Sequence, residues 1–363
     1  MAQSEQWFRP TIRAIQGYAP GEWPPLEAGV LKLNSNENPY PPSPKVLSAL
    51  EEIGSELLRR YPDPLARDFC RTVSETFGIP ADWVIAGNGS DDLLTLLVRA
   101  CAEGASRKLA YPMPTYVLYR TLAAIQPAEG VEIPYGQDGC AWQLPVDELL
   151  AADAAVTLIA TPNSPTGHVV AMDDLRRLAE GLSGVLVIDE AYVDFVGEGA
   201  DKASLALVRE LENVLVLRTL SKGYGLAGLR LGFGLAQPSL LKGLLKIKDS
   251  YNVDAIALKL GEAALRDQGY KHAIAQKIIV AREQLATDLR ALSFKVWPSK
   301  TNFLLVQPPD NLAQKIYQVL KTQGIMIRYF AQPGLDDKLR ITVGMTEQNR
   351  RVVSSITQIL TEC

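Results

Sequence analysis

The chain has 363 residues, of which 47% are hydrophobic and 21% charged, a composition typical of a globular protein with a large core. Its 37 Lys and Arg residues against 41 Asp and Glu give a formal charge of −4, and no basic run suggests binding to nucleic acid or to an anionic membrane. The two histidines and four scattered cysteines argue against a histidine-based triad, a disulfide framework and a metal site. No apolar stretch is long enough to cross a bilayer, so we expect a cytoplasmic protein with a small-molecule ligand.

The N-terminal 45 residues are rich in proline and glycine and show no sustained periodicity, which predicts an arm laid over another part of the molecule. Apolar residues at helical spacing then predict one helix over residues 44–61. A second helix is predicted over residues 64–78, closed by Gly78.

Short β-type runs alternate with helical stretches through the next part of the chain. The strands are predicted at residues 83–86, 108–111, 156–160, 185–190 and 213–219, with helical patterns between them. This alternation predicts an α/β fold with a mainly parallel sheet between two layers of helices. Ligand sites in such sheets lie at the carboxyl ends of the strands, so polar clusters at these positions deserve the closest inspection.

Beyond residue 250 the pattern changes to two long helices, at 256–267 and 273–292, followed by a compact βαβ-like tail and a final helix. We therefore predict three units. Residues 1–45 form the arm, residues 46–265 form a large domain, and residues 266–363 form a smaller α+β domain that the arm completes.

The segment around Lys222 is the first candidate site. Gly223, Gly225 and Gly228 form a GxGxxG pattern with Asp249 beyond it, but a dinucleotide site needs a helix to open at these glycines, and LRLGFGLA reads as a strand. The alternative is that Ser221 and Arg230 bind a phosphate while Lys222 supplies an amine. Lysine suits Schiff-base chemistry because a partly desolvated ammonium loses its proton readily, although a solvated surface lysine is the commoner case.

A second cluster ends the strand VLVID. Asp189 and Tyr192 lie 33 and 30 residues before Lys222, a separation that accommodates a strand, a helix and a strand. If the two strands are neighbours, a carboxylate, a phenol and a lysine converge at one end of the sheet. Such a set suits a cofactor with a protonated pyridine ring, whereas the plain alternative is a carboxylate that caps the next helix.

Two further loops follow strands. In TPNSPTG, Asn163 stands between two prolines, where its amide could donate to a cofactor oxygen or simply form a turn. In GNGSDDLL, a helix is predicted to open at Ser90 and Asp91, where backbone N–H groups attract phosphate and Gly89 allows a close approach. Tyr116, after the next strand, could stack on an aromatic ring, although a core tyrosine is the commoner role.

Taken together, these motifs resemble the fold-type-I enzymes that use pyridoxal 5′-phosphate (PLP), and specifically the histidinol-phosphate aminotransferase family. The resemblance covers essentially the whole chain and includes LNSNENPYPPSP, RYPDP, GNGSDDLL, PTYVLY, TPNSPTG, DEAY, RTLSKGYGLAGLRLG and LRITVG. Two small departures occur. Gly-Tyr follows the lysine where the family more often has Ala-Phe, and the arm has NSNENPYPPSP where NANENPYGPSP is common.

The resemblance implies a role for each motif residue. Lys222 would carry PLP, Asp189 would pair with the ring nitrogen, Tyr192 and Asn163 would bind the ring hydroxyl, and Tyr116 would stack on the ring. The phosphate would be surrounded by Gly89, Ser90, Asp91, Thr219, Ser221 and Arg230, with Tyr61 reaching it from the partner subunit of a homodimer. The substrate's anionic group would be bound by Arg340, with Arg328, Asn34, Tyr18 and Tyr61 as further candidates.

The implied activity is transfer of an amino group between histidinol phosphate and 2-oxoglutarate or glutamate, in histidine biosynthesis, by ping-pong kinetics with Lys222 as the general base. An aromatic amino-acid aminotransferase and a threonine-phosphate decarboxylase are alternatives on the same scaffold. A non-catalytic sensing domain that binds PLP or an amino acid is a third possibility, but such modules are usually fused to a DNA-binding segment, which we do not expect here.

Overall fold

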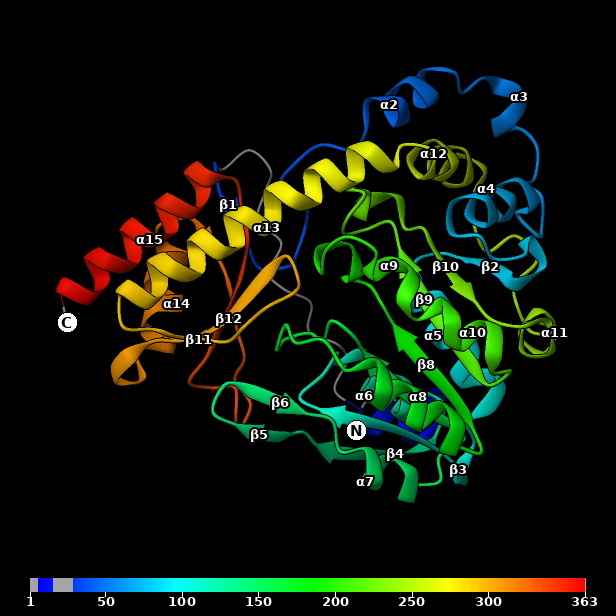
Figure 1. The fold of residues 1–363 in the computed structure, drawn as a ribbon, viewed down its shortest axis with the longest axis horizontal. Coiled ribbons are helices and arrows are strands. Elements are labelled where there is room, and N and C mark those ends of the chain that lie inside the picture. Colours follow the sequence, from blue (N-terminus) through cyan, green and yellow to red (C-terminus); the bar gives the residue numbers. More distant parts are fainter. Residues whose placement is uncertain (1–5, 16–28, 363) are drawn as a thin grey trace.

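The computed structural model describes residues 6–15 and 29–362 of the chain, so Tyr18 lies outside the described residues. Two groups of elements make up the molecule: a large sheet with its covering helices, and a smaller body that contains both the end of the N-terminal arm and the C-terminus (Figure 1). The long helix α13, Gln268–Ala291, runs from one group to the other.

Among the described residues, seven strands form the large sheet in the order β2-β10-β9-β8-β7-β3-β4. All its neighbours pair in parallel except β10, which runs antiparallel to both β2 and β9. The strand bounds are Val84–Gly87 (β2), Gly104–Met113 (β3), Ala128–Pro134 (β4), Val156–Ala160 (β7), Val185–Asp189 (β8), Val214–Thr219 (β9) and Gly232–Leu235 (β10). The predicted mainly parallel α/β sheet is confirmed.

Alternate side chains of the central strands pack into different hydrophobic clusters. In β9, Val214 and Val216 pack with one cluster, whereas Leu215 and Leu217 pack with the other. This period of two buries both faces of the sheet, which is why the central strands are continuously apolar. One face is covered by α5 (Ser90–Cys101), α6 (Leu118–Ile125) and α11 (Pro238–Leu245), and the other by α4 (Arg67–Phe77), α7 (Val146–Ala151), α8 (Met172–Gly181), α10 (Leu205–Glu210) and α12 (Ala255–Leu265).

The smaller body contains an antiparallel sheet in the order β11-β12-β15-β14. Its strands are Lys295–Val296 (β11), Phe303–Gln307 (β12), Arg328–Tyr329 (β14) and Leu339–Thr342 (β15), and the helices α13, α14 (Ala313–Thr322) and α15 (Thr346–Thr361) pack with them. The expected βαβ-like order is present, since β12 and β14 flank α14 in the sequence and both pair antiparallel with β15, which lies between them. The strand after α14, β13 (Ile325–Met326), does not join β12 but pairs in parallel with β1 (Leu31–Lys32) of the arm.

The helix expected over residues 44–61 is interrupted. It consists of α2 (Pro44–Glu51) and α3 (Ser55–Leu58), because Gly54 between them has an extended backbone with φ −104° and ψ 173°. The helix expected over residues 64–78 begins later, at Arg67, and ends as predicted at Gly78, which adopts a left-handed conformation with φ 68°. The remaining helices and strands are α1 (Pro10–Ala14), β5 (Gly136–Asp138), β6 (Ala141–Gln143) and α9 (Ala200–Ala203). Across the described ranges, no helix combines the length and apolar character needed to span a bilayer.

Candidate active site

A cavity of about 980 Å³ lies at the carboxyl ends of β7, β8 and β9. Its walls come from widely separated parts of the chain: the arm at residues 34–37, the start of α5, the loop after β9, and the segment 328–340 of the smaller body. The loops that follow the strands therefore bring the predicted polar clusters together around this cavity, as expected for an open α/β sheet.

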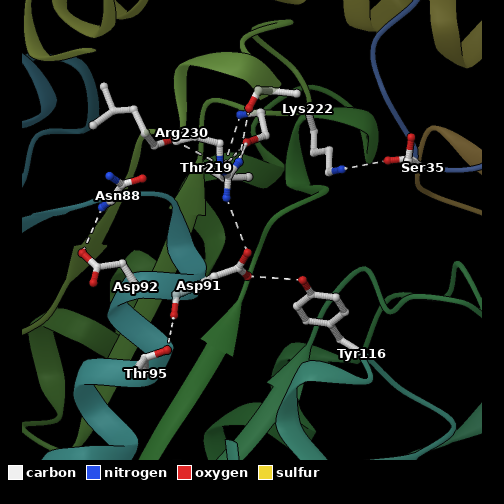
Figure 2. A network of polar contacts seen from close by, with 12 residues as sticks. Ser35, Asn88, Asp91, Asp92, Thr95, Tyr116, Thr219, Lys222 and Arg230 are labelled. Carbon is white, nitrogen blue, oxygen red and sulfur yellow. Dashed lines mark hydrogen bonds and ion pairs between the residues drawn. The ribbon is translucent and has the colours of Figure 1, made fainter. Parts of the chain in front are cut away.

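One end of the cavity is built as an anion cradle around the first turn of α5 (Figure 2). Gly89 precedes this helix with φ 79°, and a Cβ added there would lie 2.7 Å from Nη2 of Arg230. Arg230 approaches Ser221 Oγ at 3.3 Å through Nη1 and Asp91 Oδ2 at 3.5 Å through Nη2. Thr219 donates to Ser221 Oγ at 2.9 Å. A guanidinium, hydroxyl groups and the N-terminus of a 12-residue helix are a suitable set of donors for a phosphate.

Asp189 stands at the end of β8, on the floor of the cavity, and only 5% of its surface is exposed. Burial raises the pKa of its carboxyl from 3.8 to about 6, although hydrogen bonds from Tyr119 and from the Ala191 N–H oppose the shift. The Tyr119 hydroxyl donates to Oδ2 at 2.9 Å, and the Ala191 N–H donates to Oδ1 at 3.2 Å. A buried carboxylate is much more stable next to a cation, and a protonated pyridine nitrogen would supply one.

Lys222 enters the cavity from the loop after β9 and meets the N-terminal arm. Its Nζ donates to the Ser35 carbonyl at 3.4 Å (Figure 2) and lies 5.6 Å from the centroid of the Tyr192 ring. The arm also contacts Tyr192 and the backbone of Lys222. Asn36 Nδ2 donates to Tyr192 Oη at 2.8 Å, and Asn38 Nδ2 donates to the Lys222 carbonyl at 3.0 Å. The predicted convergence of Asp189, Tyr192 and Lys222 in one cavity is present.

Arg340 and Arg328 line the wall opposite the sheet, in the smaller body. Arg340 donates to the Asn34 carbonyl at 2.9 Å and to Ser164 Oγ at 3.2 Å, and its guanidinium lies 5.2 Å from the Phe303 ring centroid. These contacts fix the orientation of a planar cation that faces the cavity, which is the arrangement needed to bind a carboxylate or a phosphate with two hydrogen bonds.

Two predicted residues lie elsewhere. Asn163 is fully buried and does not line the cavity: its amide donates to the Pro114 carbonyl and to Thr166 Oγ1, and its Oδ1 accepts from Thr115. The next residue, Ser164, faces the cavity in its place. Tyr61 is 81% exposed and stacks on Tyr251 with a centroid distance of 4.5 Å, outside the cavity of its own chain.

Several residues that line the cavity or hold its lining in place were not predicted from the sequence. Tyr119 lies three positions after Tyr116 in PTYVLY, so one helical turn separates a tyrosine that borders Asp91 at 3.3 Å from one that reaches Asp189. The arm segment NSNENP contains Ser35, Asn36 and Asn38. This run of polar residues has neither a helical nor a strand pattern, and that feature could have marked it as part of a site. Within the described ranges, no three His, Cys, Asp or Glu side chains gather closely enough to hold a metal ion.

The residues present fit PLP. The cradle at Gly89 suits its phosphate because a side chain at that position would fill the space beside Arg230. Asp189 suits the ring nitrogen, and Lys222 is the amine that lines the space between these two groups and the arm. Tyr116 lines the same space and donates from Oη to Asp91 Oδ1 at 3.3 Å.

Comparison with known proteins agrees with this geometry. A family model described as aminotransferase class I and II matches residues 28–356. Histidinol-phosphate aminotransferase 1 of Trichormus variabilis is 57% identical over 354 residues, covering 98% of this chain and 99% of that protein. The histidinol-phosphate aminotransferase of Rhodopirellula baltica is 44% identical over 344 residues, covering 94% of this chain and 92% of that protein.

The fold is also that of a solved enzyme. The crystal structure of histidinol-phosphate aminotransferase from Sinorhizobium meliloti, in complex with PLP, matches with a TM-score of 0.87 at 24% identity and covers 98% of both chains. The sheet, the helices on both of its faces and the smaller body are thus those of a fold-type-I PLP enzyme. The chain belongs to the class I and II aminotransferases and, among them, to the histidinol-phosphate aminotransferase family of PLP-dependent transaminases.

Proposed function

We propose that this enzyme interconverts histidinol phosphate and 2-oxoglutarate with imidazole acetol phosphate and glutamate, the transamination step of histidine biosynthesis. The observation that carries the proposal is the 57% identity, over nearly the full length of both chains, to a histidinol-phosphate aminotransferase. The cavity is consistent with these substrates, since Arg340 and Arg328 offer two cations on the wall opposite Asp189. One substrate pair carries a phosphate and the other a second carboxylate, and guanidinium groups bind either.

In this proposal the chain's own residues divide the work. Gly89, the N–H groups of Ser90 and Asp91, and the side chains of Thr219, Ser221 and Arg230 bind the PLP phosphate. Asp189 keeps the ring nitrogen protonated, Tyr192 binds the ring hydroxyl, and Tyr116 stacks on the ring. PLP, when bound, withdraws electrons from the substrate Cα and so makes its proton acidic.

Lys222 has two tasks in sequence. Its Nζ would anchor PLP, and in the reaction it would act as the base that moves a proton at the substrate Cα. Arg340 holds the substrate's anionic group, with Arg328, Asn34 and Tyr18 as further candidates, so that the Cα–H bond stays within reach of Nζ. Two half-reactions with one shared site predict ping-pong kinetics.

Asn163 is proposed to bind the ring hydroxyl of PLP after a rotation of its side chain. Both of its amide hydrogens are donated to protein acceptors, so it reaches the ring hydroxyl only if its side chain rotates away from Pro114 and Thr166. Ser164 lines the cavity, where its Oγ accepts from Arg340.

We also propose a cytoplasmic homodimer in which Tyr61 completes the phosphate site of the partner subunit. Large apolar side chains are exposed around Tyr61, and they belong to α2, α3 and the segments beside them: Leu47, Leu50, Leu58, Leu65 and Tyr251. Several exposed large apolar side chains on neighbouring segments of the chain mark a candidate protein interface. The division into an arm to residue 45, a large domain to residue 265 and a small domain beyond it belongs to the same proposal.

The decisive experiment incubates the purified protein with histidinol phosphate and 2-oxoglutarate and measures imidazole acetol phosphate and glutamate. Formation of both products at saturable rates is expected. Phenylalanine as a far better donor would indicate an aromatic amino-acid aminotransferase, and release of carbon dioxide from threonine phosphate without consumption of an oxo acid would indicate a decarboxylase. Either outcome would refute the substrate proposal while leaving the fold and cofactor unchanged.

A further inference from the structure

A cluster of buried charges lies behind the cavity, and none of its members lines it. Lys271 of α13 is 2% exposed, and its Nζ lies 2.9 Å from Asp194 Oδ1 and 3.5 Å from Asp201 Oδ2. Its Nζ also lies 5.3 Å from the ring centroid of Tyr224. Burial opposes the charge of Lys271, but Asp194, Tyr224 and Asp201 together outweigh this effect and raise its pKa, so the lysine stays charged.

The cluster touches both loops that carry the proposed catalytic side chains. Asp194 belongs to the short helix η4, Val193–Phe195, for which Tyr192 is the preceding cap residue. It also lies against Gly223, where an added Cβ would overlap its carboxylate. Asp194 is therefore two residues from Tyr192 in sequence and in contact with the residue that follows Lys222. A single carboxylate thus bridges the ends of two neighbouring strands, β8 and β9.

Helix α13 holds the same short helix at a second point. Arg282, also nearly fully buried, donates to the Phe195 carbonyl at 3.2 Å and to the Thr301 carbonyl at 2.9 Å. The long helix thus presents two buried cations to the turn that begins at Tyr192. Hydrogen bonds from Gln268 Nε2 to Tyr224 Oη, at 3.0 Å, connect the start of α13 to the Lys222 loop as well.

Burying the charges of this cluster costs free energy, and filling the interior does not require charged residues. Three charged side chains are removed from water here. Apolar residues could fill the same volume, and replacing buried ion pairs by apolar residues often leaves the stability of a protein unchanged or raises it. What the ion pairs add is a fixed geometry, because Asp194 is confined between a cation and a glycine. The segments that carry Tyr192 and Lys222, two side chains that must stay within reach of one cofactor, are thus both anchored to helix α13.

We infer that Lys271, through Asp194, is a positioning residue for catalysis: it fixes the Tyr192 turn and the Lys222 loop relative to each other and thereby sets the placement of Lys222 Nζ. This inference rests on the proposed roles of Lys222 and Tyr192. Lys271 contacts neither substrate nor cofactor, so its removal changes the chemistry only by displacing groups that do.

The test uses the PLP-loaded enzyme and three variants of α13. Lys271→Met removes the charge, Lys271→Arg retains it, and Arg290→Met removes an exposed charge from the other end of the helix as the matched control. For Lys271→Met we expect kcat to fall by roughly 10- to 100-fold with KM within about threefold, since a misplacement of about 1 Å has effects of this size. We also expect the pH midpoint of the visible absorbance of bound PLP to move by at least about half a unit, because the surroundings of Lys222 change.

Lys271→Arg is expected to restore most of both properties, and Arg290→Met to match the wild type. If Lys271→Met does not fold, the double variant Lys271→Met/Asp194→Asn neutralises the nearer and more buried of the two carboxylates that lose their partner, and it tests the same inference. A folded variant without the Lys271 charge, with unchanged kcat and an unchanged absorbance midpoint, overturns the inference. Borohydride reduction and peptide mapping of the wild type separate the two claims: a pyridoxyl group on another lysine refutes the proposed function, whereas a label on Lys222 with indifferent variants refutes only the role of Lys271.

Discussion

The ionisation of Asp189 depends strongly on the surroundings of its carboxyl group. Its pKa of about 6 in the folded chain lies above its ordinary value of 3.8, so the folded state binds the proton more tightly than the unfolded state. In the cofactor-free protein, this group therefore destabilises the fold as the pH rises from 4 through 6. We expect a contribution of about 3 kcal/mol, which is the free-energy equivalent of the shift.

The measurement compares urea unfolding of the cofactor-free wild type and Asp189→Asn between pH 4 and pH 8. The difference between the two proteins isolates Asp189 from other carboxyl groups, and the wild type should lose stability relative to the variant as the pH rises. A difference that is flat with pH would contradict the buried carboxylate. In steady-state assays the same variant should lose kcat by roughly 100-fold or more, because a neutral amide does not hold the ring nitrogen protonated.

Lys222 allows the most direct test of the site. Lys222→Ala should bind PLP without a covalent link and lose turnover on the order of 10⁵-fold, since the change removes both the anchor and the base. Stopped-flow absorbance and borohydride labelling measure the two effects separately. Lys242→Ala, at an exposed position of α11, serves as the control and should behave as the wild type. Retained turnover in Lys222→Ala would assign the base to another group.

At this scale, the sequence indicated which side chains end the strands but not which way they point. Asp189 and Lys222 are at the expected edge because the carboxyl ends of parallel strands share one side of the sheet. Arg230 reaches the same edge for another reason, since it precedes β10, which runs antiparallel to β9. Asn163 and Ser164 are adjacent and equally polar, and only the path of the turn decides which of them faces the cavity. Tyr119 was overlooked because a tyrosine in an amphipathic helix reads as part of the core.

Among the elements, the start of α5 gives a prediction about the cofactor phosphate. Gly89 has φ 79°, and a Cβ there would lie 2.7 Å from Arg230 Nη2. Gly89→Ala should weaken PLP binding by roughly 10-fold or more, since backbone strain and displacement of the guanidinium act together. Fluorescence titration of the cofactor-free protein measures the dissociation constant.

Gly228→Ala is the matched control for this change, because no other atom lies within 4 Å of a Cβ added at Gly228. It should bind PLP as the wild type does. Equal effects of the two substitutions would contradict the proposal that Gly89 makes room for the phosphate beside Arg230.

The elements themselves were predicted with uneven success, for local reasons. The strands around Asp189 and Lys222 were found because each is a short apolar run bounded by polar residues. The helix over residues 44–61 was expected to be continuous because its apolar spacing persists across Gly54, where the backbone turns. The pairing of β13 with β1 was not predicted, because the order of strand and helix in the tail does not reveal a partner in the arm.

On the scale of the whole molecule, the exposed apolar surface around Tyr61 predicts self-association. The wild type should sediment at twice the chain mass of 39.7 kDa. Leu58→Asp, at a position that is 61% exposed, should shift it towards the monomer and weaken PLP binding, because Tyr61 is then lost from the partner's site. Analytical ultracentrifugation with a parallel PLP titration tests both effects.

Val280→Asp provides the comparison, since Val280 is 68% exposed on α13 and is not part of the surface around Tyr61. It should leave the sedimentation coefficient unchanged. A monomeric wild type with full PLP affinity would refute the shared site. The sequence pattern alone could not predict this surface, because the apolar residues of α2 and α3 have the same helical spacing as those that face a core.

The pairing of β1 with β13 has a consequence for how the protein is made. Leu31 lies opposite Ile325, so a segment synthesised among the first residues finds its partner only near the end of translation. Such a distant contact forms late, because most of the chain must be ordered before the two ends meet. The large sheet can form on the ribosome well before that point, yet the arm that supplies Ser35 to the Lys222 side chain and Asn36 to Tyr192 still lacks its β-strand partner. We therefore expect nascent chains to become competent for PLP only after Met326 has left the ribosomal tunnel.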